Sequence, residues 1–332
     1  MSGTMLPPDY ELPGSSIAQH PLEQRDAARL LVALGGQVSH AHVRDLPVLL
    51  GPGDVVVVNT SKVVPARLAL HKASGGAAEV LLLEPLPGSE GHWEALVRPG
   101  RRLPPGTVLW AGSEAVVEVG ERTAEGNRVV RALTEDLERF GALALPPYIH
   151  GPLQDPERYQ TVYADRPGSV AAPTAGLHLT HEVLEGCRRA GAVVVEVDLA
   201  VGLGTFRPIK QGAVEAHDMH SERYHVPEET WAACRHARRV VAVGTTTVRA
   251  LEAAGASGQL SGRTDLFIQP GFDFGVVDVL LTNFHQPRST LLVLLEAFAG
   301  PGWRRLYSSA LEEGYRFLSF GDAMLVDRTG AA

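Results

Sequence analysis

Three short loops bring together residues that could do chemistry. They are GLGTFRP (202–208), GTTTVR (244–249) and TNFHQPRST (282–290), and each follows an apolar, β-branched run. Each loop offers hydroxyl, amide or imidazole groups together with an arginine. Such groups bind the hydroxyls and anions of a small polar ligand. We therefore predict that the three loops form the walls of one pocket.

Two of these loops resemble known nucleotide motifs only in part. GLGTF lacks the third glycine of a dinucleotide fingerprint, and a simple turn is the favoured interpretation of its glycines. At GTTTVR, free N–H groups at a helix start would suit an anion or a ribose edge. The alternative is that Thr245 or Thr246 is an ordinary helix N-cap.

Histidines mark two further segments. HDMHSERYHV (217–226) places His217 and His220 close to Glu222, but neither HExxH nor CxxC occurs, so a metal site is disfavoured. His220 or Glu222 as an acid–base group or substrate anchor fits better. In PTAGLHLT (173–180), His178 precedes a predicted helix that Thr180 caps. A structural role for His178 is the alternative to a functional one.

Alternating strands and helices must position these loops. Strand-like runs at 193–200, 240–246 and 276–284 alternate with helix-like runs at 229–239, 247–255 and 289–300. This alternation predicts a largely parallel, barrel-like sheet covered by helices, with its site at the carboxyl ends of the strands. Near the start, GDVVVVNTSKVVPARL (53–68) predicts a buried strand entering a loop, and LEQRDAARLLVAL (22–34) has the apolar spacing of a helix.

The pattern changes between about residues 68 and 145. Short β-rich runs there alternate with turn clusters such as KASGG and LPGSEG. We predict a small antiparallel β-barrel or sandwich at 68–145, inserted into a large α/β domain formed by 1–67 and 146–332.

Bulk properties exclude several classes of protein. The chain has 332 residues, of which 45% are hydrophobic, and this is enough for two domains with a sizeable core. Its two cysteines, Cys187 and Cys234, exclude a disulfide framework, and both lack a catalytic setting. With neither a signal peptide nor a membrane segment, we expect a cytoplasmic protein that has no membrane partner. The net charge of −8 means that any RNA binding needs a local basic patch, such as Arg98, Arg101 and Arg102.

Several of these motifs together resemble one family. VNTSKVVPARL, PTAGLHLT, VGLGTFRPI, VAVGTTTVRALE and LLTNFHQPRSTLL occur in family order over essentially the whole chain. The sequence thereby resembles the S-adenosylmethionine:tRNA ribosyltransferase-isomerases of queuosine biosynthesis. The resemblance implies a large α/β domain with a small inserted β-barrel. We expect a monomer or a weak homo-oligomer. It also implies transfer of the ribosyl part of S-adenosylmethionine to the 7-aminomethyl-7-deazaguanine base of the tRNA anticodon, giving epoxyqueuosine, adenine and methionine, with no metal or organic cofactor.

The same resemblance implies roles for residues in matching motifs. The candidate acid–base groups are His178, His220, Glu222 and His285. Arg249 is implied as the anchor of a carboxylate or phosphate. The remaining candidate substrate contacts are Asn59, Lys62, Arg67, Thr174, Thr205, Arg207, Ser221, Thr245, Thr246, Asn283 and Asp322.

The chain also departs from the usual family pattern inside these motifs. Ala200 stands where the family has histidine, and the other departures are Thr60, Gln286, Glu296 and Phe320. Glu296, on an otherwise apolar helix, must be paired or reach solvent or ligand, or else the helix exposes one edge. Two alternative functions therefore stay open: an enzyme of the same fold acting on a non-tRNA acceptor or with altered chemistry, and a non-catalytic RNA- or nucleoside-binding module.

Overall fold

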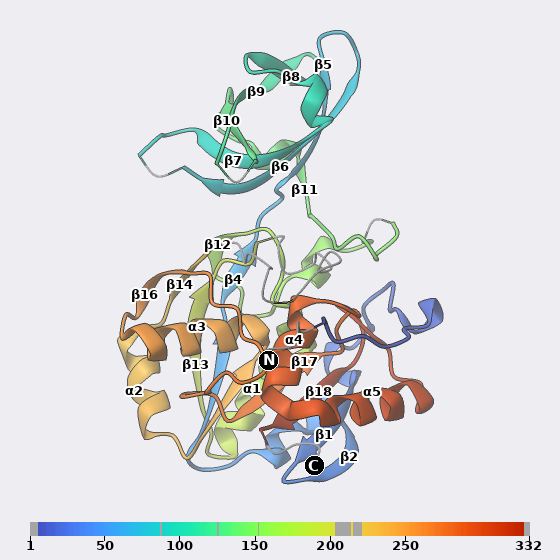
Figure 1. Cartoon of the computed structure of the whole chain (residues 1–332), viewed down its shortest axis with the longest axis vertical. Coiled ribbons are helices and arrows are strands. Elements are labelled where there is room, and N and C mark those ends of the chain that lie inside the picture. Colours follow the sequence, from blue (N-terminus) through green and yellow to red (C-terminus); the bar gives the residue numbers. More distant parts are fainter. Residues whose placement is uncertain are drawn as a thin grey trace. The chain divides into compact units, whose positions relative to one another are not determined.

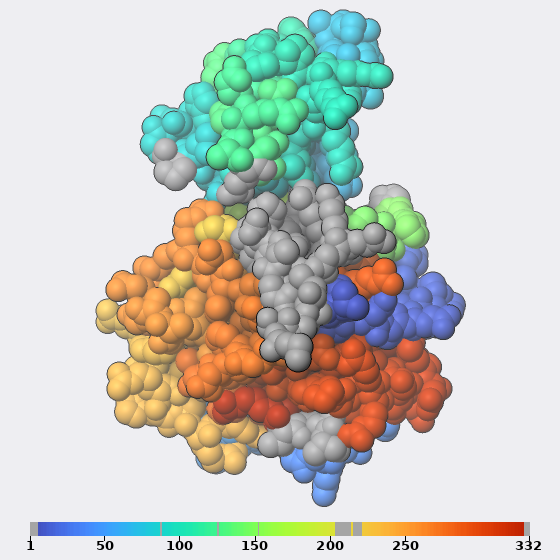
Figure 2. Space-filling view, in the orientation of Figure 1, coloured from blue at the N-terminus to red at the C-terminus, as the bar shows by residue number. Residues whose placement is uncertain are grey.

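The computed structural model describes residues 6–86, 88–124, 126–151, 153–202, 214 and 221–328. The chain divides into two compact units (Figure 1). The α/β unit comprises Met1–Lys62, Pro147–Arg166 and Ala172–Ala332, and the barrel unit comprises Val63–Pro146 and Pro167–Ala171. In the space-filling view, the dark blue residues near the N-terminus and the orange-to-red residues both belong to the α/β unit, so segments from the two ends of the sequence share one unit (Figure 2).

The α/β unit is built on a nine-stranded sheet with the order β16-β14-β13-β3-β15-β17-β18-β1-β2. These strands are β1 (Arg29–Leu34), β2 (Gln37–His42), β3 (Asp54–Asn59), β13 (Val193–Leu199), β14 (Glu222–His225), β15 (Arg239–Val243), β16 (Ser261–Thr264), β17 (Val279–Asn283) and β18 (Ala323–Asp327). The α/β fold class is confirmed, but the sheet is mixed and linear. The pairings among β13, β3, β15 and β17 are parallel, as is β1 with β18, and the other four are antiparallel.

Helices follow the strands as the sequence predicts. They are α1 (His181–Arg189), α2 (Glu228–His236), α3 (Thr245–Ser257), α4 (Thr290–Ala299) and α5 (Trp303–Glu312). The Thr180 side chain accepts a hydrogen bond from Val183 N, which confirms it as the N-cap of α1. For α3 the N-cap is Gly244, whose φ of 90° favours glycine, so the N-cap alternative for Thr245 and Thr246 is wrong. No helix among the described residues is long and apolar enough to span a membrane.

The helix predicted at 22–34 is wrong in its second half. A short 3-10 helix, η2 (Arg25–Ala27), leads into strand β1. Gly35 and Gly36, with φ of 58° and 76°, then form a tight turn into β2. Because β1 lies between β18 and β2, its apolar residues are buried in the sheet, and this pairing outweighs their helical spacing.

One face of the sheet carries a continuous apolar core. Val56, Val58 and Val243 lie on it, together with Val183 and Leu184 of α1. Alternate residues of β3 point to this face, as the period of a strand requires. The buried layer holds the sheet rigid below the carboxyl ends of its strands.

The barrel unit is a closed antiparallel barrel. Its strands are β5 (Arg67–Lys72), β6 (Ala77–Pro85), β7 (His92–Arg98), β8 (Thr107–Ala111), β9 (Glu114–Arg122) and β10 (Arg128–Ala132), with β11 (Gly141–Ala142) added beside β5. The order β5-β6-β7-β10-β9-β8 closes through pairing of β8 with β5, so the barrel is favoured over the sandwich. β4 (Ser61–Val63) and β12 (Arg166–Ser169) form a separate two-stranded sheet.

Candidate active site

The carboxyl ends of the parallel strands meet at one edge of the α/β sheet. Strands β3, β13, β15 and β17 end there, and a small pocket lies beside the ends of β15 and β17. Its polar lining consists of Thr174, Thr245, Thr246, Thr282, Asn283 and His285. The structure thus brings together five residues that the sequence singled out, and adds Thr282, which lies inside the TNFHQPRST motif but was not named as a candidate.

Asn283 is the centre of a buried hydrogen-bond network in this pocket. Thr174 Oγ1 donates to Asn283 Oδ1 at 2.8 Å, and this fixes the orientation of the amide. Asn283 Nδ2 then donates to His178 Nε2 at 2.9 Å and to Leu318 O at 3.3 Å. His178 lies on the 3-10 helix η7 (Thr174–His178) that precedes α1. The network therefore makes His178 Nε2 an acceptor and leaves the ring proton on Nδ1.

Burial controls the charge of His178. Burial, assisted by Arg316 and Arg25, lowers its pKa to about 4. The imidazole is therefore neutral at physiological pH. A neutral ring whose Nε2 already accepts a hydrogen bond is suited to positioning, and it is a weak base.

His285 is the second buried histidine, and it also lines the pocket. Its Nε2 lies 3.1 Å from Thr282 Oγ1, while its Nδ1 has no hydrogen-bond partner among the described residues. Burial lowers its pKa to about 3, so this ring is neutral as well. A buried polar atom without a partner is unfavourable, and a ligand atom would relieve the cost.

Two tyrosines that the sequence analysis did not single out hold the main chain of His285. Its N–H donates to Tyr307 Oη at 2.9 Å, and Tyr10 Oη donates to its carbonyl at 2.5 Å. Tyr10 is 275 residues away in sequence, so only the fold reveals this support. Hydrogen bonds to both the N–H and the carbonyl of His285 thus hold the main chain that carries the imidazole.

Asn59 ties the end of β3 to its neighbours. Its Nδ2 donates to Leu199 O at 3.0 Å and to Thr246 Oγ1 at 3.3 Å, while its Oδ1 accepts from Leu199 N at 3.0 Å. The side chain therefore joins β3 to β13 and orients the Thr246 hydroxyl at the pocket.

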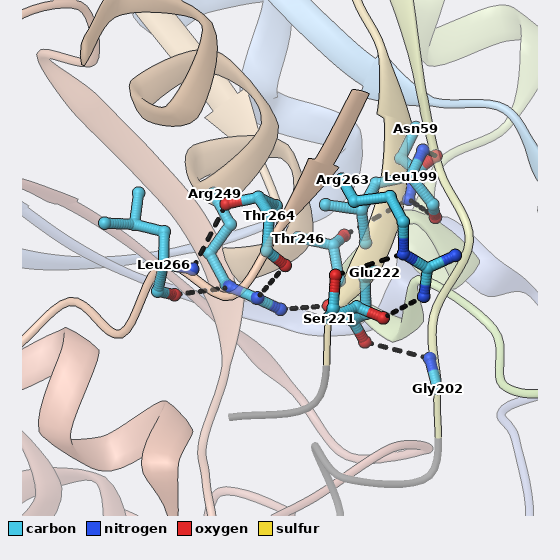
Figure 3. Close-up of polar contacts among 10 residues, drawn as sticks. All are labelled: Asn59, Leu199, Gly202, Ser221, Glu222, Thr246, Arg249, Arg263, Thr264 and Leu266. Carbon is cyan, nitrogen blue, oxygen red and sulfur yellow. Dashed lines mark hydrogen bonds and ion pairs between the residues drawn. The ribbon is translucent and has the colours of Figure 1, made fainter. Parts of the chain in front are cut away.

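Glu222 and Arg249 form a buried ion pair (Figure 3), and their side chains are 5% and 3% exposed. Arg249 Nε also donates to Leu266 O at 3.0 Å, and Glu222 Oε1 accepts from Gly202 N at 2.9 Å. Both charges are therefore satisfied inside the protein. The geometry favours a brace that fixes Gly202, where the chain leaves β13, over contact with a ligand.

Ser221 begins the segment that leads into β14. Arg263 Nε donates to Ser221 Oγ at 3.1 Å, and Arg263 Nη2 donates to Ser221 O at 2.7 Å. In Figure 3 this contact lies next to the Glu222 side chain. Ser221 is therefore held by the neighbouring strand β16.

The described candidates Lys62, Arg67 and Asp322 do not line the pocket. Lys62 is exposed on β4, and Arg67 belongs to the barrel unit, where its Nε lies 3.8 Å from Glu79. The Asp322 carboxylate accepts from the backbone N–H groups of Arg29 and Arg316, each at 2.8 Å, and burial raises its pKa. Its contacts are therefore with the main chain. The candidates Thr205, Arg207 and His220 lie outside the described residues.

The departures from the family pattern fall at different places. Ala200 follows β13, and its N–H donates to Arg223 O at 3.1 Å. Thr60 Oγ1 donates to Val197 O at 3.2 Å. Gln286 lines a second small pocket, which shares Asn283 and His285 with the first.

Glu296 is paired within the protein. Arg304 on α5 lies 2.8 Å from its carboxylate, and the Glu296 side chain is 18% exposed. An internal partner therefore accounts for the carboxylate without a ligand. The described residues contain no group of three or more histidine, cysteine, aspartate or glutamate side chains that could hold a metal, and His217 lies outside them with His220.

Comparisons with known proteins agree with this architecture. The family model described as "Queuosine biosynthesis protein" matches residues 8–326. S-adenosylmethionine:tRNA ribosyltransferase-isomerases from Rubrobacter xylanophilus and Thermus thermophilus are 52% and 50% identical, over 96% of this chain and over 96% and 98% of their own lengths. A crystal structure of S-adenosylmethionine tRNA ribosyltransferase from Thermotoga maritima is similar with a TM-score of 0.55 and 38% identity, covering 96% of this chain and 98% of that one. With its sheet, its barrel and its matching sequence, the chain belongs to the family of queuosine biosynthesis proteins.

Proposed function

We propose that this protein transfers and isomerises the ribosyl part of S-adenosylmethionine onto the 7-aminomethyl-7-deazaguanine base of a tRNA anticodon. The products are epoxyqueuosine in the tRNA, adenine and methionine. One observation carries the proposal: a small pocket whose lining includes six uncharged polar side chains lies at the carboxyl ends of the strands in a chain that matches the family from residue 8 to 326. Hydroxyl and amide groups of this kind suit a ribose, and His285 Nδ1 suits a polar atom of the sugar or of adenine.

The pocket also suggests where the methionine carboxylate binds. Arg249 is the well-shaped partner by residue type, but its guanidinium already pairs with Glu222. Helix α3 begins at Thr245 beside the pocket, and the first N–H groups of a helix attract anions. We assign the carboxylate to this helix start, with Arg249 as a brace.

The chemistry requires a base that removes a proton from the carbon next to the sulfonium. His178 and His285 have pKa values lowered to about 4 and 3, so each is a weak base, and Glu222 is ion-paired. His220 is the remaining candidate among the four acid–base residues, on the strength of its motif. His178 and His285 are better suited to hold the substrate with neutral hydrogen bonds.

Incubation with S-adenosylmethionine, with and without an anticodon stem-loop that carries the modified base, tests the proposal. Adenine and methionine are measured in both samples. We expect release only when the RNA is present. Equal release without RNA would instead indicate a different acceptor, and binding of S-adenosylmethionine without any release would indicate a non-catalytic module.

A further inference from the structure

One corner of the barrel unit concentrates arginine. The arginine corner comprises Arg67, Arg98, Arg101 and Arg102, and the latter two lie on the 3-10 helix η4 (Gly100–Arg102) directly after β7. Arg98 and Arg67 have side chains that are 80% and 41% exposed, and Arg101 and Arg102 are exposed as well. Arg98, Arg101 and Arg102 are therefore exposed to solvent, whereas Arg67 is exposed in part and its Nε is buried.

Acidic groups compensate little of this charge. A single carboxylate, Glu79, lies 3.8 Å from Arg67 and 4.0 Å from Arg98. Arg101 and Arg102 have no ion-pair partner among the described residues. Two other arginines of the same unit, Arg131 and Arg139, are paired with Glu118 and Glu114. The corner is thus a local positive patch on a chain with a net charge of −8.

A buried arginine braces the turn that carries these side chains. Arg128 is 8% exposed, and its Nη2 donates to Leu103 O at 2.6 Å and to Gly100 O at 3.2 Å. Its Nη1 donates to Gly120 O at 2.9 Å, which fixes the turn to β9. A braced turn presents Arg101 and Arg102 with little main-chain entropy left to lose on binding.

We propose that the arginine corner binds the phosphate backbone of the RNA acceptor. The inference rests on the proposed function, since it requires an RNA substrate. Planar guanidinium groups bind phosphate oxygens in a bidentate manner, and such contacts position a nucleic acid without selecting its sequence. The corner contributes affinity and orientation for the tRNA, while the α/β pocket carries out the reaction.

The test is a titration of a fluorescently labelled anticodon stem-loop, followed by anisotropy at a series of KCl concentrations. For R101A/R102A we expect affinity to fall about tenfold at low salt, with the slope of log affinity against log salt reduced by about 1.4. The loss should be equal for an unrelated stem-loop, because phosphate contacts are sequence-independent. S-adenosylmethionine binding should stay at the wild-type level.

Two further variants separate charge from folding. R101K/R102K keeps both charges, so its salt slope should match wild type. R139Q removes one arginine of the same unit that is already paired with Glu114, so its affinity should change little. Wild-type affinity and slope in R101A/R102A would overturn the inference, as would anionic-vesicle binding lost in that variant while RNA binding is kept. Adenine release by the wild-type protein tests the proposed function separately.

Discussion

The two ends of the α/β sheet treat their buried polar groups in opposite ways. At the amino ends of the parallel strands, Asp54 pairs with Arg238 and Arg239 at 2.8 and 2.6 Å. Nearby, Glu252 accepts hydrogen bonds from three successive backbone N–H groups, those of Gly275, Val276 and Val277. These carboxylates have partners that hold loops to the sheet. The charge and the hydrogen-bonding capacity of these carboxylates are taken up by contacts within the protein.

The buried polar groups at the carboxyl ends of the strands differ in their hydrogen bonding. His285 Nδ1, Ser61 Oγ and Thr290 Oγ1 are buried and have no hydrogen-bond partner among the described residues. Buried polar groups normally find partners, and of these three residues His285 lines the pocket, so its Nδ1 suits an atom of a ligand. The amino end thus has carboxylates that are fully paired, whereas the carboxyl end has a pocket-lining nitrogen without a partner among the described residues.

The largest expected effect comes from removing a hydrogen-bonded carboxylate at the amino end of the sheet. Replacing Glu252 with alanine removes the buried carboxylate that accepts from three backbone N–H groups, of which that of Val277 is itself buried, and a hydrogen bond to a charged group contributes roughly 1.5–3 kcal/mol. We expect the free energy of unfolding, measured in urea, to fall by about 3 kcal/mol or more. Glu252→Gln keeps one acceptor oxygen and should lose less. If Glu252→Ala were as stable as wild type, the hydrogen bonds of Glu252 would not stabilise the amino end of the sheet.

At the carboxyl ends of the strands, a substitution should lower activity more than stability. His285→Leu removes the unpaired nitrogen, and adenine release should fall about 100-fold, as when one positioned hydrogen-bonding group is lost from an active site. The free energy of unfolding should fall by less than in Glu252→Ala, by about 1–2 kcal/mol, because leucine loses the contact of Nε2 with Thr282 Oγ1, whereas Nδ1 had no partner among the described residues. His225→Leu, on β14, is the matched control and should keep wild-type activity. A large loss of stability with normal turnover would contradict this assignment.

Acid should weaken the protein through the two buried histidines. Their pKa values of about 4 and 3 lie below the ordinary value of about 6.5, so between these limits the unfolded chain binds more protons than the folded one. Stability should therefore be full above pH 6.5 and decrease as the pH falls, by up to about 1.4 kcal/mol per histidine for each pH unit. Urea unfolding from pH 7 to pH 5 measures this, and His285→Leu should retain only the share of His178. A flat profile would show that the imidazoles are not held neutral.

The smallest effect is expected at Ala200, next to the pocket-lining Val201. Ala200→His restores the residue usual in the family at a half-buried position whose backbone is already held by Arg223. We expect adenine release with the modified stem-loop to change by less than about tenfold, equivalent to about 1.4 kcal/mol. A change larger than tenfold would show that Ala200 takes part in the choice of acceptor.

Local sequence patterns predicted residues that line the pocket, but they could not predict which side chains far apart in the sequence contact each other. Polar residues after apolar strands located Thr245, Asn283 and His285, because parallel strands deliver their carboxyl ends to one edge. The pairing of Arg249 with Glu222, 27 residues away, and of Asn283 with His178, 105 residues away, depends on strand order. For the same reason the sequence offered Arg249 as an anchor for a ligand, without its ion pair with Glu222. Strand β1 was missed because its pairing partner β18 lies at the other end of the chain.

The contact between Thr174 and Asn283 has a consequence for selectivity. A hydroxyl has a single hydrogen, and that of Thr174 is committed to Asn283 Oδ1. Toward the pocket, Thr174 Oγ1 therefore offers only lone pairs. A sugar hydroxyl can donate a hydrogen bond to this oxygen. An ether or carbonyl oxygen in the same place has no hydrogen to donate, so its lone pairs would repel those of Thr174 Oγ1. Under the proposed function, we expect this oxygen to select by hydrogen-bond polarity, so that a substrate whose ribose hydroxyl is methylated binds poorly although it is nearly the same size.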